Sequence, residues 1–383
     1  MLIDTSLTSD IIYFWGYFLS TFSFMFGALV YLSLNPIGKD YLAFFNRDIE
    51  QDSSPNMYKV MFVFLLSILV TISYYRVVGT NLFLTAALGI AIEDFTTSRL
   101  AAYSSDTYFA PGYVNQFKNV LLPLTTSILG ALFYLQGSKV KFRLLVIAAA
   151  LFLPFALLGT GQRAFLAYSF AAFIFGLVCI ADIKPRQVII PGIIIFGLFS
   201  FMTFLYKNYQ FEDGNNVFVM SVLKTFERFF YTEQYDTLIS FRELFQRDIV
   251  FFYEWYEQLR GLVPGQSGSY LQHEMFAMVH GTDRGTLAIS TVASVIYNGG
   301  IVMVTVAYLL FGYINLMIYH RFLRGRRSII RVFSYGALFF YLATFVTGGP
   351  STFVNKGGLA ILLFLIIRKL MFNSPKFQKA KSL

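Results

Sequence analysis

The chain has 383 residues, of which 56% are hydrophobic and 13% charged, and its formal net charge is +9. Soluble domains carry about 25% charged residues, so this composition leaves too little polar surface for a water-soluble fold. The single cysteine, Cys179, excludes a disulfide within the chain and a cysteine-based metal site.

Apolar blocks long enough to cross a bilayer recur along the whole sequence. Inside a bilayer the backbone polar groups must be satisfied within each segment, so these blocks predict helices. We therefore expect an all-α fold, a polytopic transmembrane helical bundle that forms one domain over 1–383. The expected spans are 11–33, 60–78, 120–137, 144–159, 164–181, 188–206, 301–319, 332–347 and 357–371.

Two features of the N-terminal part bear on the number of spans. Residues 1–10 contain no Lys or Arg, so we expect the first block to be retained as a span rather than cleaved as a secretory signal. Residues 81–94 are apolar but short. If they cross, there are ten spans and the N-terminus is cytoplasmic; if they re-enter or lie in the interface, there are nine. The basic loop 34–59 favours nine, with the N-terminus outside.

The basic residues are unevenly divided between the two sets of connections. One set, which includes the C-terminal segment, holds 18 of the 30 Lys and Arg but 5 of the 21 Asp and Glu. The positive-inside rule makes this set cytoplasmic, which predicts a bacterial inner membrane protein with its large loop in the periplasm. The net charge is therefore a topology signal, and no basic-aromatic pattern points to nucleic acid.

The long outer loop, 207–285, is expected to contain amphipathic helices. Apolar residues recur at helical spacing over 219–245, and aromatic residues are dense from there to 256. This pattern fits an interfacial helix with an aromatic belt, or a groove for a lipid or sugar. Residues 286–297 predict a short apolar helix, which closes the 207–300 region and is broken at Asn298-Gly299-Gly300. The break either lines a cavity or is a plain turn.

Arg163 ends the tight GTGQR turn 159–163 between two spans that contain no charge. A cation at the membrane boundary is costly unless it snorkels or pairs. Arg163 therefore marks either an anion site, such as one for a lipid pyrophosphate, or a side chain that snorkels to the headgroups.

A second group of polar residues precedes the broken helix. It comprises His273, Glu274, His280, Asp283 and Arg284. The histidine spacing is not a metal-ligand pattern, so we weigh a general base beside a guanidinium against a solvated loop. The other outer arginines are Arg76, Arg99, Arg228, Arg242, Arg247 and Arg260. Surface pairing explains many of them, and Arg228 and Arg260 rank highest because their surroundings are aromatic.

Several stretches resemble one family. These are GTGQRAFLAY at 159–168, RLAAYSSDTYFAPGYVNQFKNVLLPL at 99–124, the dominant outer loop, and ASVIYNGGIVMV at 293–304. Together they resemble the Wzy-type O-antigen polymerases, which join oligosaccharide repeat units of bacterial surface polysaccharides. Arg284 is followed by Gly300, similar to the Arg-x15-Gly pattern described in that family. Related ligases carry a His-Asn pair where this chain has TVASVIY, which favours a polymerase.

The resemblance implies a GT-C-like membrane glycosyltransferase that acts on undecaprenyl-pyrophosphate-linked oligosaccharides. Its pyrophosphate would be bound by Arg163 and Arg284, supported by Arg228, Arg260, Arg99 and Arg76, because guanidinium groups stay charged and fork onto phosphate. The base would be His280, His273 or Glu274. No metal or cofactor is expected, since no Asp-x-Asp pair occurs. A chain-length regulator and the repeat-unit flippase are the expected protein partners.

Three other functions fit parts of the pattern. A flippase or transporter predicts charges within the spans and inverted repeats. A ligase would move finished glycan to a lipid or protein acceptor. A structural scaffold of the assembly machinery predicts that no single outer arginine matters.

Overall fold

The computed structural model describes residues 4, 6–50, 54–90, 98, 111–136, 140–162, 164–180, 217–263, 271–281 and 289–371, together with parts of 189–203, 266–269 and residue 287. All regular elements among these residues are helices, beside one isolated bridge between Glu50 and Ser328. The all-α prediction is therefore confirmed for the described part of the chain.

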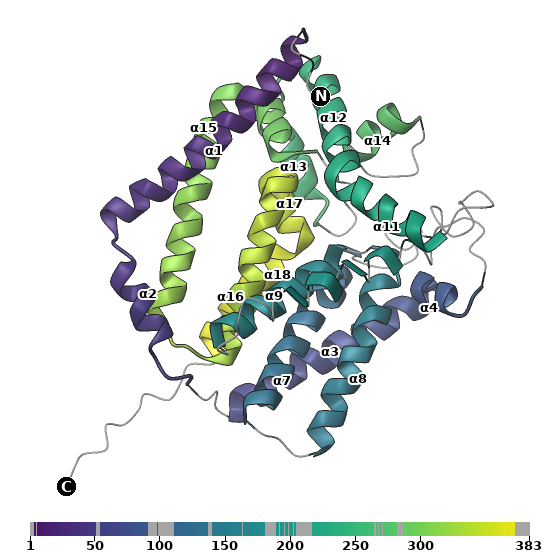
Figure 1. Cartoon of the computed structure of the whole chain (residues 1–383), viewed down its shortest axis with the longest axis vertical. Coiled ribbons are helices and arrows are strands. Elements are labelled where there is room, and N and C mark those ends of the chain that lie inside the picture. Colours follow the sequence, from purple (N-terminus) through teal and green to yellow (C-terminus); the bar gives the residue numbers. More distant parts are fainter. Residues whose placement is uncertain are drawn as a thin grey trace.

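The first half of the chain forms α1 (Thr8–Leu34), α2 (Gly38–Phe45), α3 (Ser54–Val78), α4 (Leu82–Ala87), α6 (Pro111–Gln116), η1 (Phe117–Leu121), α7 (Leu122–Gln136), α8 (Val140–Leu158) and α9 (Ala164–Ile180). The second half forms α11 (Val217–Glu227), η3 (Arg228–Thr232), α12 (Glu233–Phe245), α13 (Tyr253–Arg260), α14 (Leu271–His280), α15 (Thr291–Arg324), α16 (Ile329–Ala343), η4 (Thr344–Thr347), α17 (Gly349–Phe353), η5 (Val354–Gly358) and α18 (Leu359–Met371). Figure 1 shows their arrangement.

Four of the described helical stretches are long and apolar enough to cross a membrane. They are Thr8–Leu34, Met57–Val78, Thr291–Arg324 and Gly349–Ile366. Shorter apolar helices cover Ile147–Leu158, Ala164–Ile180, Gly192–Phe201 and Ile329–Ala343. The fold is thus that of a helical membrane protein, and the predicted nine or ten spans and GT-C likeness stay predictions.

Helix α1 packs its small and polar residues inward and its large apolar residues outward. Its buried residues include Gly16, Ser20, Ser23 and Gly27, whereas Phe22 is more than half exposed, as are its neighbours Met25, Phe26 and Leu29. In water a surface helix buries its apolar face. The reverse pattern is expected when lipid covers the outer face, because helices then associate through small residues that let backbones approach.

The partner of α1 over its whole length is α15 (Figure 1). At Gly27 an added Cβ would lie 2.0 Å from the Leu309 carbonyl oxygen, and at Gly312 one would lie 2.1 Å from that of Phe24. Both backbones therefore touch at positions where only glycine fits, which holds the two helices side by side.

Two large buried apolar clusters lie in the described part of the chain, besides a small one formed by Leu82 and Leu158. The larger is built from α2, α3, α7, α8, α9, α16, α18 and the end of α15, with Phe44, Leu129, Phe333 and Ile361 among its fully buried members. The smaller joins the first half of α1 and α15 to α12 and α14. The smaller cluster fixes the helices of the long loop on the bundle.

Two of the basic connections, 34–50 and 320–331, meet at one end of the bundle. Arg327 donates hydrogen bonds to the carbonyl oxygens of Phe45, Arg47 and Cys179. The buried His320 hydrogen-bonds Tyr31 through Nδ1 and Asp40 through Nε2, each at 2.8 Å. These contacts join α2, the end of α9 and the end of α15, while α12, α13 and α14 lie at the other end (Figure 1).

Residues 81–90 do not cross the bundle. Asn81 caps the six-residue helix α4 by accepting from the Leu84 N–H, and the Leu82 N–H donates to the Gly159 carbonyl. Six helical residues extend only about 9 Å, and the chain turns at 88–90. The described part thus favours the re-entrant or interfacial interpretation, and 91–94 lie outside the described residues.

The break in the helix before the seventh expected span is confirmed at Gly300, whose φ of 75° and ψ of 179° are non-helical. The carbonyls of Tyr297 and Asn298 accept instead from the N–H groups of Val250 and Phe252, each at 3.0 Å. Broken backbone at membrane depth must be covered by protein or water. Here the segment before α13 covers it, and the helix begins at Thr291 rather than 286.

The amphipathic helix expected over 219–245 forms as α11, η3 and α12 in succession. Its second half is packed, since Leu238, Phe241 and Leu244 are buried. Its first half leaves apolar side chains exposed, including Val219, Leu223, Phe226 and Phe230. An exposed apolar face of this kind fits an interfacial helix.

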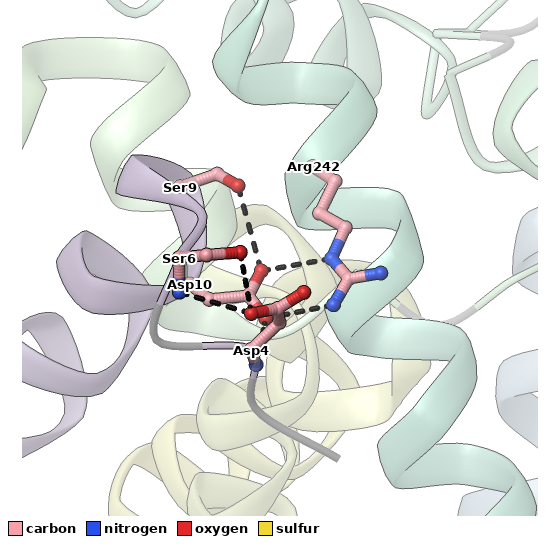
Figure 2. Close-up of polar contacts among 5 residues, drawn as sticks. All are labelled: Asp4, Ser6, Ser9, Asp10 and Arg242. Carbon is pink, nitrogen blue, oxygen red and sulfur yellow. Dashed lines mark hydrogen bonds and ion pairs between the residues drawn. The ribbon is translucent and has the colours of Figure 1, made fainter.

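An ion pair anchors α12 to the start of α1 (Figure 2). Arg242 donates from Nε and Nη2 to the two carboxylate oxygens of Asp10, at 2.8 and 2.7 Å. Asp10 is completely buried, whereas a quarter of the Arg242 side chain is exposed. The Asp4 N–H and the Ser9 hydroxyl also donate to Asp10, so the carboxylate is fully hydrogen-bonded.

We expect Asp10→Ala to lower the free energy of unfolding by roughly 2–4 kcal/mol, because it leaves a partly buried guanidinium unpaired. Thermal unfolding in detergent would measure the change. The control is Glu274→Ala, which removes the exposed Arg247–Glu274 pair and should cost about 1 kcal/mol or less. Recovery of stability in the swapped variant Asp10→Arg with Arg242→Asp would identify the pair itself as the cause. Equal effects of the two single variants would contradict the assignment.

Candidate functional site

A buried carboxyl group lies where α13 crosses the kinked part of α15. Glu254 is 6% exposed, and its Oε2 accepts from the Asn298 side-chain amide at 3.0 Å. The Gln258 amide, one turn later on α13, donates to Oε1. The neighbouring Trp255 donates from Nε1 to the Ser294 hydroxyl at 2.8 Å. The two polar pairs hold one face of α13 on α15, just before Gly300.

The same polar cluster extends to the C-terminal helices. The hydroxyl of buried Ser351 on α17 donates to Gln258 Oε1 at 2.5 Å. Asn355 on η5 donates to the Gln258 carbonyl at 3.3 Å and accepts, through its own carbonyl, from the Gln116 amide at 2.9 Å. The cluster therefore links four parts of the chain: α6, α13, α15 and the α17–η5 segment.

Burial raises the pKa of the Glu254 carboxyl above its ordinary value of 4.5, while the hydrogen bonds from Asn298 and Gln258 lower it and offset part of that effect. Among the described residues no cation pairs with the Glu254 carboxylate, and the amides of Gln258 and Asn298 stabilise its charged form. A carboxyl with a raised pKa outside the spans is a feature typical of functional sites.

The opposite face of α13 is aromatic and exposed. Tyr253 and Tyr256 are about 60% exposed, and Phe251 and Phe252 precede them at the surface. Arg260 ends the helix: its Nη1 donates to Glu257 Oε1 at 3.0 Å, and its Nε is buried without a hydrogen-bond partner. Helix α13 thus combines an aromatic surface, a guanidinium with an unused donor and a buried acid.

The backbone of Phe251 and Phe252 is strained, since both residues have positive φ values of 44° and 68°. Bulky side chains rarely adopt this region and do so at a cost of order 1–3 kcal/mol each. The strained segment includes Phe252, whose N–H, with that of Val250, donates to the carbonyl groups at the kink. It also sets the direction in which α13 leaves the kink.

The three candidates on α14 lie apart from α13, against α12 and the segment after it. Glu274 accepts from Arg247 Nη2 at 2.8 Å, and His280 Nε2 lies 3.5 Å from Asp236 Oδ2. His273 is half-buried on the same helix. The Glu274 carboxylate is therefore engaged in an ion pair at the surface, and the Nε2 atom of His280 faces a carboxylate, so both groups that a general base would use lie against other side chains.

The predicted arginines do not form one group within the described residues. Arg76 is exposed at the end of α3, Arg228 is exposed on η3, and Arg260 lies on α13. Arg163, Arg284 and Arg99 lie outside the described residues, as does Asp283. The predicted grouping of Arg163 with 273–284 thus stays a prediction.

Among the described residues, no three His, Cys, Asp or Glu side chains gather as ligands for a metal ion. The chain matches no protein-family model, and neither a curated protein nor a solved structure was found to be similar to it.

Glu254 was not among the residues singled out in the sequence, although both segments that meet there were. The aromatic stretch 251–256 and the Asn298-Gly299-Gly300 break each stood out. The sequence did contain a signal for this residue. Glu254 is an acid flanked by Tyr253 and Trp255, about one helical turn before Gln258 and about two turns before Arg260. The pairing with Asn298 needs the fold, because 44 residues separate the two side chains.

The raised pKa of Glu254 should make the stability of the folded protein depend on pH. A raised pKa in the folded state contributes stability below the unfolded value of 4.5, and this contribution is lost as pH rises toward the folded value. We therefore expect the unfolding temperatures of wild type and Glu254→Gln to be closest near pH 4, with the variant gaining relative to wild type as pH rises to 8. Thermal scans in detergent over this range measure the difference, and a constant difference would contradict the assignment.

Proposed function

We propose that the chain polymerises lipid-linked oligosaccharide repeat units at the outer face of a bacterial inner membrane, with undecaprenyl pyrophosphate as the leaving group. The observation that carries the proposal is the composition of α13, at the end of the bundle away from the Arg327 contacts. Exposed tyrosines there adjoin a guanidinium with an unused buried donor, Arg260. The sequence resemblance to Wzy-type polymerases supports the same proposal.

The two kinds of side chain suit the two parts of such a substrate. Tyrosine rings have an apolar body and a polar end, which fits the boundary where a lipid carrier meets its sugar. A guanidinium keeps its charge at any working pH and donates in pairs to phosphate oxygens. Fixed cations that receive the charge developing on a leaving group are often the largest catalytic contribution.

In the proposed reaction, an acceptor sugar hydroxyl attacks the anomeric carbon of the growing chain. A carbon–oxygen bond to the acceptor forms, and the bond from that carbon to the pyrophosphate oxygen breaks. The electron pair leaves with undecaprenyl pyrophosphate, and the hydroxyl proton passes to a base. Arg163, Arg284 and Arg260 would bind the pyrophosphate, with Arg228, Arg99 and Arg76 as further substrate contacts.

The product distinguishes this proposal from the other functions. Purified protein in vesicles, supplied with lipid-linked repeat units, should yield long repeats that remain on the carrier lipid. Glycan on a new acceptor would indicate a ligase. Movement of the lipid across the bilayer without chain growth would indicate a flippase, and either result would overturn the proposal.

We expect Arg260→Ala to lower the rate of chain growth at least ~10-fold, a loss of about 1.4 kcal/mol in transition-state stabilisation. Arg163→Ala should lower it similarly, and Arg260→Lys should recover only part of the activity because the fork is lost. The control, Arg326→Ala, changes an exposed arginine at the basic end of the bundle. Wild-type rates in both alanine variants, at equal protein levels, would remove these arginines from the site.

A further inference from the structure

Lys118 is a completely buried lysine whose ammonium group has no hydrogen-bond partner. It lies in η1, at the start of α7, and its Nζ is 5.1 Å from the centre of the Tyr74 ring and 5.8 Å from that of Tyr75. Cation–π contacts offset part of the cost of burying a cation. They leave its hydrogen-bonding capacity unused, which is expensive away from water.

The turn that leads to Arg163 packs beside the same tyrosine. The Tyr75 hydroxyl donates to the Ala156 carbonyl at 2.8 Å, and a Cβ added at Gly159 would lie 2.4 Å from the Tyr75 oxygen. The end of α8 and the turn 159–162 are therefore adjacent to Tyr75, and Tyr75 is in turn adjacent to Lys118. The fold thus brings Lys118 near the 159–162 turn, which precedes Arg163.

Buried oxygen atoms without hydrogen-bond partners occur in both segments. In the helix around Lys118 they are the side-chain oxygens of Asn115, Gln116 and Asn119, and in the turn they are those of Thr160 and Gln162. Buried polar atoms in proteins are nearly all hydrogen-bonded, so each exception calls for an explanation. The segment around Lys118 holds three of these oxygens beside an ammonium group without a hydrogen-bond partner, and the neighbouring turn holds two more. Such a set of atoms is suited to binding a polar ligand.

The two sets of atoms select the chemistry of that ligand. An ammonium donates to anionic oxygens, whereas amide and hydroxyl oxygens accept from donors such as sugar hydroxyls. A glycosyl phosphate or diphosphate carries both kinds of group on adjacent atoms. A simple anion would satisfy Lys118 and leave the oxygens unpaired, and a neutral sugar would do the reverse.

From this geometry we infer that Lys118, with the 159–162 turn, forms a binding site for the sugar diphosphate head group of a lipid-linked substrate. The inference rests on the proposed function for the identity of the lipid, and it adds Lys118 to the arginines proposed to bind the diphosphate. The polar cluster of α13 is continuous with it, because Gln116 donates to the Asn355 carbonyl and Asn355 to that of Gln258.

Binding can be tested on the full-length protein in detergent, by calorimetry with a short-chain polyprenyl diphosphate, inorganic pyrophosphate and the matching polyprenyl alcohol. We expect the wild type to bind the prenyl diphosphate, and Lys118→Met to weaken this binding at least ~10-fold, as loss of a buried charge-assisted contact implies. Pyrophosphate binding that also depends on Lys118 would assign the anion alone as the contact. Unchanged binding in Lys118→Met, or equally tight binding of the alcohol, would overturn the inference.

The variants control for folding and for general charge. Lys118→Met replaces a buried cation with an apolar chain of similar length, so we expect it to fold. If it does not, Thr160→Val removes one of the partner-free oxygens without changing charge, and should weaken binding of a glycosyl diphosphate severalfold while leaving pyrophosphate unchanged. No change in that comparison would also overturn the inference. Lys224→Met, which alters an exposed lysine paired with Glu227, should bind as the wild type does.

The same variants separate this inference from the proposed function. Chain growth in Lys118→Met at the wild-type rate, with unchanged diphosphate binding, would reject the Lys118 site and leave the polymerase proposal standing. The opposite result is that the wild-type protein binds the diphosphate, that this binding requires Lys118, and that no polymer forms. It would reject the polymerase proposal and leave the Lys118 site standing.

Discussion

The kink at Gly300 is the constraint on which the placement of α13 and its polar cluster depends. A break in a buried helix frees carbonyl groups that must find other donors. Those of Tyr297 and Asn298 are satisfied by the strained segment before α13. That contact places Glu254 beside the Asn298 amide and turns the tyrosines of α13 outward. The position of the candidate site therefore follows from a local break in a helix that is long and apolar enough to cross a membrane.

The bundle below the kink is held by close backbone packing rather than by a conventional apolar core at every contact. Glycines of α1 and α15 let these helices touch, and large apolar side chains of α1 point outward. This is the pattern expected when lipid rather than water surrounds the helices. It leaves polar side chains on the inner faces, and the Asp10–Arg242 pair shows how one of them is satisfied.

Charged groups in the described part of the chain fall into two kinds. Those of the first kind are held by ion pairs or by carbonyl groups, as Asp40 and Arg327 are. The Nζ of Lys118 and the Nε atoms of Arg260 and Arg331 are buried without hydrogen-bond partners. Groups of the first kind are explained by stability and topology. A buried donor without a partner is costly, and the proposed ligand would supply partners for Lys118 and Arg260. Arg331 is held differently, because its Nη2 donates to the carbonyl groups of Arg321 and Phe322.

The sequence by itself determined the class of the fold, because composition and the backbone requirement of the bilayer leave helices as the outcome. It also located local features: the first helix, expected over 11–33 and found at Thr8–Leu34, and the break at 298–300. Only the tertiary structure decided which distant side chains meet. Asp10 and Arg242 are 232 residues apart, and Glu254 and Asn298 are 44 apart. The burial of Lys118 could not be predicted from the sequence for the same reason. The local pattern of residues sets where a helix forms, whereas the burial and partners of a side chain depend on which helices pack together.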